Sequence, residues 1–111
     1  MSTTGSASNQ LNFPTTLNFD SYGNLFVVDQ NNARIQKFVQ LNITNEHSYN
    51  QPMFCSNASW DPNAITFSYN VSIPSTGMFI DTNNTIYIAD GINGRIQIWL
   101  TGSTNPTKIL S

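Results

Sequence analysis

One internal repeat, at an offset of 61 residues, limits what this chain can fold into more than any other feature. The segment LFVVD at residues 25–29 matches IYIAD at residues 86–90, position by position. The same offset carries Asp20 onto Asp81 and the triplet at 34–36 onto the triplet at 95–97. Because acid and arginine keep the same spacing in both copies, we interpret the chain as two copies of one structural unit.

Each copy is predicted to form antiparallel strands. In the first copy the expected strands cover residues 16–20, 25–29 and 34–40, and in the second copy 77–81, 85–90 and 95–100. The turn after Asp20 contains Gly23, which is typical of hairpin chemistry. A fourth strand is expected at 65–69 and at 107–110, and no helical period interrupts the pattern. The sequence therefore predicts an all-β chain.

The central strands are apolar at both odd and even positions. In a sheet with one face exposed to water, apolar and polar residues should alternate along each strand, whereas a strand covered on both sides has a continuous run of apolar residues. Each four-stranded unit is therefore expected to have a neighbour on either face. Face-to-face stacking of repeated four-stranded sheets is the arrangement of a β-propeller.

The spaced residues of the first copy resemble an NHL repeat. The matching pattern is Pro14, then Asp20-x-x-Gly23-Asn24, then an apolar run closed by Asp29, then Asn32-x-Arg34-Ile35-Gln36. The second copy departs at Asn84 and Thr85, where the family places Gly and Asn. The resemblance implies two four-stranded antiparallel propeller blades, an open fragment of an NHL-type β-propeller. Family members commonly assemble about six such blades into a ring that binds other molecules.

The repeat also divides the chain. We expect a flexible N-terminal segment at 1–12, a first blade at 13–72 with an inserted loop at 41–64, and a second blade at 73–111. The loop contains His47 and Cys55, which could be a Cys–His nucleophile pair. Nothing recognisable orients such a pair or supplies an oxyanion donor, so a surface His and a Cys that packs or pairs with another chain are favoured.

Two acid–arginine pairs recur, Asp29 with Arg34 and Asp90 with Arg95. They could clamp a charged ligand, or they could be structural ion pairs across a hairpin. A binding site is usually unique whereas a constraint of the fold recurs, so the repetition favours structural ion pairs.

The turn acids Asp20 and Asp81, with the asparagines beside them, have two interpretations as well. They could be calcium ligands or could cap their own turns. A calcium loop needs six or more oxygens and usually a closing Glu, and the chain's only Glu, Glu46, lies in the insertion. Turn capping is favoured. We therefore assign no catalytic, metal or cofactor residue.

Composition excludes several partners. Four Lys and Arg residues against six Asp and Glu residues leave no basic patch for nucleic acid. No run approaches the roughly 20 apolar residues that span a bilayer, and the first residues do not have the pattern of a signal peptide. The many Asn residues and the scarce charge favour an extracellular location. Four sequons are candidate glycosylation sites, at Asn42, Asn57, Asn70 and Asn83.

The leading functional hypothesis is a non-enzymatic scaffold that binds a protein or a small ligand through its loops. The resemblance also allows a part of a propeller enzyme similar to the metal-dependent peptide-amidating lyase, or an extracellular sensor domain of a longer receptor or kinase. Two stacked blades leave two outer apolar faces. If each is on the order of 500 Å², covering it contributes about 12 kcal/mol. Self-association or further blades from a longer chain are therefore expected.

Overall fold

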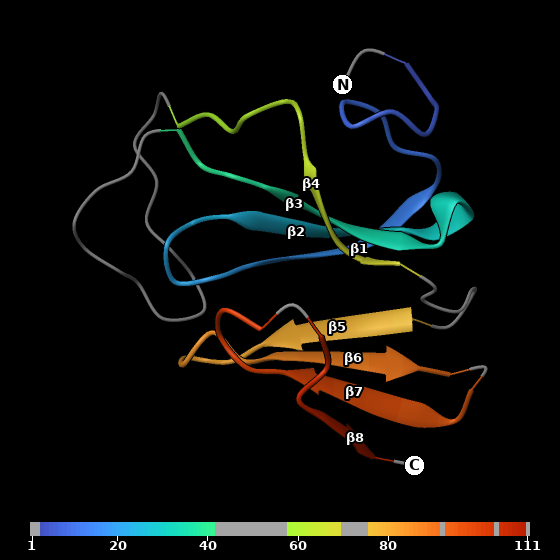
Figure 1. The fold of residues 1–111 in the computed structure, drawn as a ribbon. Coiled ribbons are helices and arrows are strands. Elements are labelled where there is room, and N and C mark those ends of the chain that lie inside the picture. Colours follow the sequence, from blue (N-terminus) through green and yellow to red (C-terminus); the bar gives the residue numbers. More distant parts are fainter. Residues whose placement is uncertain (1–2, 42–57, 70–75, 92, 104, 111) are drawn as a thin grey trace.

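The computed structural model describes residues 3–41, 58–69, 76–91, 93–103 and 105–110. These residues form two four-stranded antiparallel sheets that stack face to face (Figure 1). The first sheet has the order β1-β2-β3-β4, with β1 at Pro14–Phe19, β2 at Leu25–Asp29, β3 at Arg34–Phe38 and β4 at Ile65–Tyr69. The second sheet has the order β5-β6-β7-β8, with β5 at Thr76–Ile80, β6 at Ile86–Asp90, β7 at Arg95–Trp99 and β8 at Lys108–Leu110.

The all-β prediction is confirmed, and all eight expected strands are present, with ends that differ by at most two residues. Each sheet is a meander in which neighbours along the chain are neighbours in space, and neither sheet closes on itself. A short 3-10 turn, η1 at Gln30–Asn32, connects β2 to β3. Residues 42–57, which make up most of the expected insertion, lie outside the described residues.

The two copies use the same backbone geometry at their turns. Gly23 and its counterpart Asn84 both have positive φ, at 84° and 62°. Ala33 and its counterpart Gly94 repeat this, with φ of 50° and 61°. Gly and Asn are the residues that tolerate a left-handed backbone best, which explains why Asn can stand where the first copy has Gly. Ala33 tolerates it less well and is the strained member of the second pair.

The core lies between the sheets. It combines three buried side chains of the first sheet with four of the second: Phe26, Val28 and Ile35, and Ile80, Ile86, Ile88 and Trp99. The partly buried ring of Phe67 bridges them, edge-on to Phe26 at 5.5 Å and tilted against Trp99 at 4.6 Å between centroids. Burial of this apolar surface is the main force that holds the sheets together.

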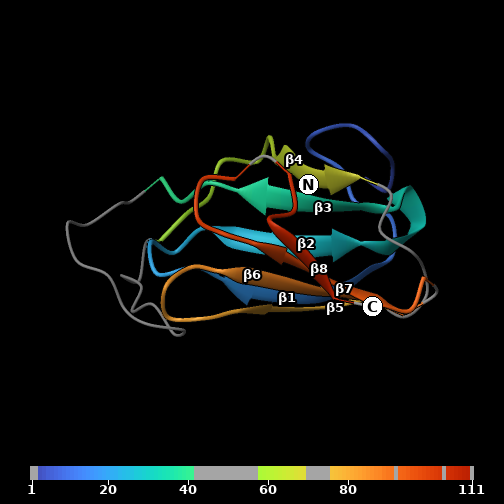
Figure 2. The same cartoon turned by 60° about the horizontal axis from the view of Figure 1, so that its bottom comes forward.

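The sheets approach most closely along one edge. β1 lies beside β5, and from there the sheets diverge toward β4 and β8, as Figures 1 and 2 show. The two sheets are therefore arranged as a wedge, with a narrow edge at the first strand of each sheet.

The sheets stack with unlike faces in contact. Phe26 and Val28 are buried in the core, but their repeat counterparts Tyr87 and Ala89 lie on the far face of the second sheet. Conversely, Ile88 is fully buried in the core, whereas its counterpart Val27 lies on the far face of the first sheet. One face of the unit thus packs against the opposite face of the next unit.

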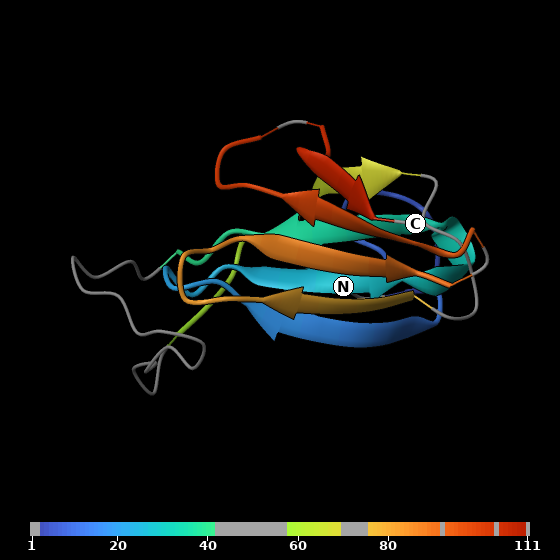
Figure 3. The ribbon, with the colours of Figure 1, turned by 90° about the horizontal axis from the view of Figure 1, so that it is seen from below.

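The two far faces differ in how they are covered. On the first sheet, Val27, Gln36 and Phe38 are buried, and the N-terminal segment of residues 3–12 lies on this side (Figure 1). On the second sheet the far face carries Phe79, Tyr87, Ala89, Ile96, Ile98 and Leu110, together with Lys108, which pairs with Ile98. Phe79 is 54% exposed and Ile96 41%, and Figure 3 shows no described segment over this face. Two-sided burial thus holds for the central strands β2 and β3 of the first sheet, although Leu17 of β1 on the same face is 59% exposed, and it fails, within the described residues, for the second sheet.

Candidate functional site

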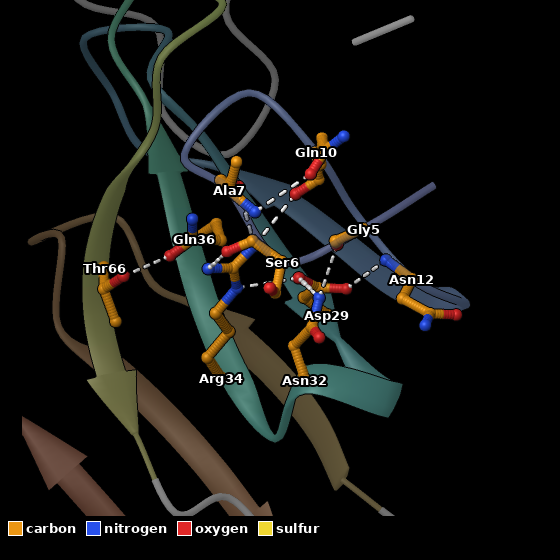
Figure 4. A network of polar contacts seen from close by, with 10 residues as sticks. All are labelled: Gly5, Ser6, Ala7, Gln10, Asn12, Asp29, Asn32, Arg34, Gln36 and Thr66. Carbon is orange, nitrogen blue, oxygen red and sulfur yellow. Dashed lines mark hydrogen bonds and ion pairs between the residues drawn. The ribbon is translucent and has the colours of Figure 1, made fainter. Parts of the chain in front are cut away.

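The Arg34 guanidinium organises the far face of the first sheet (Figure 4). Its Nε donates to Oδ2 of Asp29 at 2.8 Å. Its other nitrogens donate to three backbone carbonyls of the N-terminal segment, Ser6 at 2.8 Å, Ala7 at 3.1 Å and Gln10 at 2.9 Å. Four of the five donors of the guanidinium are thus taken by the protein itself. This leaves Arg34 little capacity to hold a charged ligand.

Asp29 is equally saturated. Its side chain is 0% exposed, and besides Arg34 it accepts hydrogen bonds from the Asn12 backbone N–H at 2.7 Å and from Asn32 Nδ2 at 2.8 Å. The Asn32 amide also donates to the Gly5 carbonyl. The sequence predicts a flexible segment at residues 1–12; of these, residues 3–12 are hydrogen-bonded to the first sheet through a network that sequence reasoning missed.

The second ion pair has the same strand register as the first, but its arginine is more exposed to solvent. Arg95 Nε donates to Asp90 Oδ2 at 2.8 Å; the Arg95 side chain is 32% exposed, whereas the Asp90 side chain is 0% exposed, as that of Asp29 is. Burial by itself raises the pKa of Asp90, but hydrogen bonds from Asn93 and Arg95 outweigh it and lower the pKa below its ordinary value. Both ion pairs thus exist, and each joins the last residue of one strand to the first residue of the next.

The turn acids cap their own turns, as predicted. Asp20 accepts from the backbone N–H groups of Tyr22 and Asn24 and from the Asn24 side chain. Asp81 accepts from the backbone N–H groups of Asn83 and Thr85. These carboxylates are occupied as turn caps.

The remaining oxygen of Asp81 has a further partner. It accepts a hydrogen bond from the Tyr87 hydroxyl at 3.0 Å. This bond, together with desolvation and the charge of Asp81, raises the pKa of Tyr87.

The two turns are also bonded to each other. Asn84 Oδ1 accepts from the Ser21 N–H at 2.8 Å, and Asn84 Nδ2 donates to the Ser21 hydroxyl at 2.7 Å. This reciprocal pair joins the first sheet to the second at the turn end. Asn84 thus has two roles, the left-handed turn position and the link between sheets.

Several predicted positions lie outside the described residues: Asn42, Asn57 and Asn70 of the sequons, and His47 and Cys55 of the insertion. Asn83 is described and exposed, at the turn between β5 and β6, while Thr85 of the same sequon is 8% exposed. No group of three or more His, Cys, Asp or Glu side chains with the geometry to hold a metal ion occurs in the described ranges. Within those ranges no helix has the length and apolarity to cross a membrane.

A cleft of about 520 Å³ opens between the sheets at the turn end. Its walls come from Phe26, Lys37, Ile65, Thr66 and Phe67 of the first sheet, from Ile86 of the second, and from residues 100–103 of the connection between β7 and β8. Asp20, Tyr22, Asn24 and Asn84 of the turns close the lining. The cleft is thus largely apolar and has one ammonium group.

Lys37 is the residue that sequence reasoning missed. It pairs with Phe26 across β2 and β3 and points between the sheets, with Nζ at 5.6 Å from the centre of the Phe26 ring. A signal for it exists in the repeat, because the second copy has Ile98 at the same position. A lysine on a face that the other sheet covers, at a position where the second copy has an isoleucine, is unusual and indicates that apolar packing alone does not determine this position.

No protein-family description matches the chain, and no curated protein matches it. The class that fold and contacts define is an all-β chain of two four-stranded antiparallel sheets, stacked with unlike faces together.

Proposed function

We propose that the chain is a non-enzymatic interaction scaffold built from two NHL-type propeller blades. The observation that carries this proposal is the stacking of unlike faces. An interface between equivalent units that uses two different surfaces is heterologous, and such an interface can be repeated to build a ring or a filament. A pair of like faces would instead have ended the assembly at two.

The wedge shape supports a ring over a flat stack. Because the sheets meet along β1 and β5 and diverge toward β4 and β8, repetition of the same step turns around the narrow edge (Figure 2). Blades radiating from a central axis have this arrangement in a β-propeller. The recurrent Asp–Arg pairs are the structural ion pairs of the repeat, and the turns and loops are the surfaces that contact partners.

The open face of the second sheet supplies the first test. Phe79, Ile96 and Leu110 are between 41% and 54% exposed, and an apolar face of this kind marks an interaction surface. We expect the 111-residue chain to self-associate in sedimentation and to bind a dye that reports exposed apolar surface.

Ile96→Lys should reduce both self-association and dye binding, since it places a charge on that face. Leu41→Lys is the matched control, because Leu41 is 59% exposed and lies outside both sheets. A monomer that melts cooperatively and binds no dye would overturn the proposal.

A further inference from the structure

We propose that the cleft between the two sheets binds a small amphiphilic anion, an apolar ring or chain that ends in one carboxylate. The inference gives a ligand class to the scaffold proposed above, and it rests on that proposal only in treating the chain as a binding module. It depends on the shape and charge of the cleft itself and needs no third sheet.

The apolar part of the ligand follows from the walls. Phe26 and Ile86, at 3% and 5% exposed, are the most buried of the lining residues, and the Phe67 ring stands edge-on to Phe26. A volume of about 520 Å³ is in the range of small-molecule sites, which are mostly apolar with a few polar groups. An aromatic ring fits such walls, since tilted and edge-on ring contacts are favourable.

The anionic end follows from Lys37. Among the described residues the ion pairs are Asp29–Arg34 and Asp90–Arg95, and neither includes Lys37. Its ammonium lies over the Phe26 ring, so a carboxylate that binds it also places its apolar part on the aromatic wall. The second copy has Ile98 at this position, so strand packing alone does not require the charge.

The other charged group that lines the cleft, the Asp20 carboxylate, does not favour a cationic ligand. Asp20 is 6% exposed and both of its oxygens accept hydrogen bonds within its own turn. A cationic ligand would therefore have to share a carboxylate that is already occupied, and would face the Lys37 ammonium as well. The same cleft with its single available ammonium thus selects for an anion over a cation.

The test uses three probes that share one ring and chain and differ in charge: 4-phenylbutyrate, 4-phenylbutanol and 4-phenylbutylamine. Binding to the whole chain is followed by amide chemical shifts in NMR. We expect saturable shifts at Phe67, Ile86 and Thr101, with an affinity order of carboxylate, then alcohol, then amine. An exposed ion pair accounts for about a fivefold preference of carboxylate over alcohol.

Lys37→Met should abolish the preference for carboxylate over alcohol while leaving alcohol binding in place. Lys108→Met is the matched control, because Lys108 is exposed on β8 away from the cleft, and it should leave all three affinities unchanged. Equal affinity of the three probes for the wild type would overturn the inference even if the variant failed to fold.

Shifts confined to Phe79, Ile96 and Leu110 would overturn it too, since the probe would then bind the open face. These outcomes are separable from the proposed scaffold function. If the chain self-associates but shows no preference for the carboxylate probe, only the ligand class is refuted. If the chain is a monomer that binds no dye but still prefers the carboxylate probe, only the scaffold function is refuted.

Discussion

Replacing Arg34 by Met removes the guanidinium and keeps a side chain of similar length. The Asp29 carboxylate then remains 0% exposed without its counter-charge, and three carbonyls of the N-terminal segment lose their donor. Loss of one partner of a buried ion pair costs about 3–5 kcal/mol. A domain is stable by about 5–15 kcal/mol, so Arg34→Met should remove about a fifth or more of the total.

The repeat provides an internal control for this change. Arg95→Met deletes the same side chain at the same register, but the Arg95 side chain is 32% exposed. Asp90 is 0% exposed, as Asp29 is, but its partner reaches water, so the cost should lie between that of an exposed pair, about 1 kcal/mol or less, and that of a fully buried pair. The structure thus predicts unequal costs for one substitution at two positions that the sequence alone treats as equivalent.

Urea unfolding measures the difference. With a slope of about 2 kcal/mol per molar urea, the midpoint should fall by about 2 M for Arg34→Met and by about 1 M for Arg95→Met. Hydrogen exchange gives an independent readout, because the Asn12 amide donates to Asp29 and should exchange faster once Arg34 no longer holds the segment. Equal midpoint shifts in the two variants would refute the reasoning.

Three further outcomes follow from single contacts. The folded pKa of Asp90 is below its unfolded value near 4, so the ionised carboxylate stabilises the fold above about pH 4 and this effect is lost as the pH falls. Asp90→Asn should therefore weaken the loss of unfolding free energy below about pH 4, as measured by urea titrations at several pH values. An unchanged pH dependence in the variant contradicts this. Asp81→Asn should lower the pKa of Tyr87 toward its ordinary value in an NMR titration, because the Asp81 hydrogen bond raises it; no movement contradicts the assignment. Trp60→Phe removes the 2.8 Å bond to the Gly23 carbonyl and should cost about 1 kcal/mol in urea unfolding, whereas an unchanged midpoint would show that this bond does not contribute.

The strands were predictable because their signals are local. Apolar runs such as 25–29 and 86–90 mark the central strands, and Asp20 and Asp81 mark the turns through bonds to nearby N–H groups. The repeat strengthened each assignment, because the same local pattern occurred twice. The ion pairs followed from the same logic, since the acid and the arginine are hairpin neighbours in both copies.

Long-range contacts were not predictable in this way. The N-terminal segment has no apolar pattern, and its attachment depends on backbone carbonyls that any sequence possesses. The cleft depends on the angle between two sheets, which brings Phe67 and residues 100–103 together from distant parts of the chain. Lys37 carried a signal only by comparison with Ile98, and that comparison becomes meaningful once the covered face is known.

The two ends of the stack are chemically different, and this difference follows from stacking unlike faces. The far face of the first sheet ends in a buried network, where Arg34 binds residues 3–12 and Val27 and Phe38 are shielded. The far face of the second sheet exposes Phe79 and Ile96 within the described residues. If the face with the arginine is the one that receives a preceding unit, residues 3–12 occupy part of that place in this chain. Under the proposed function, growth would then be directional: a further unit would add to the second sheet, and addition to the first sheet would require displacement of the segment that Arg34 holds.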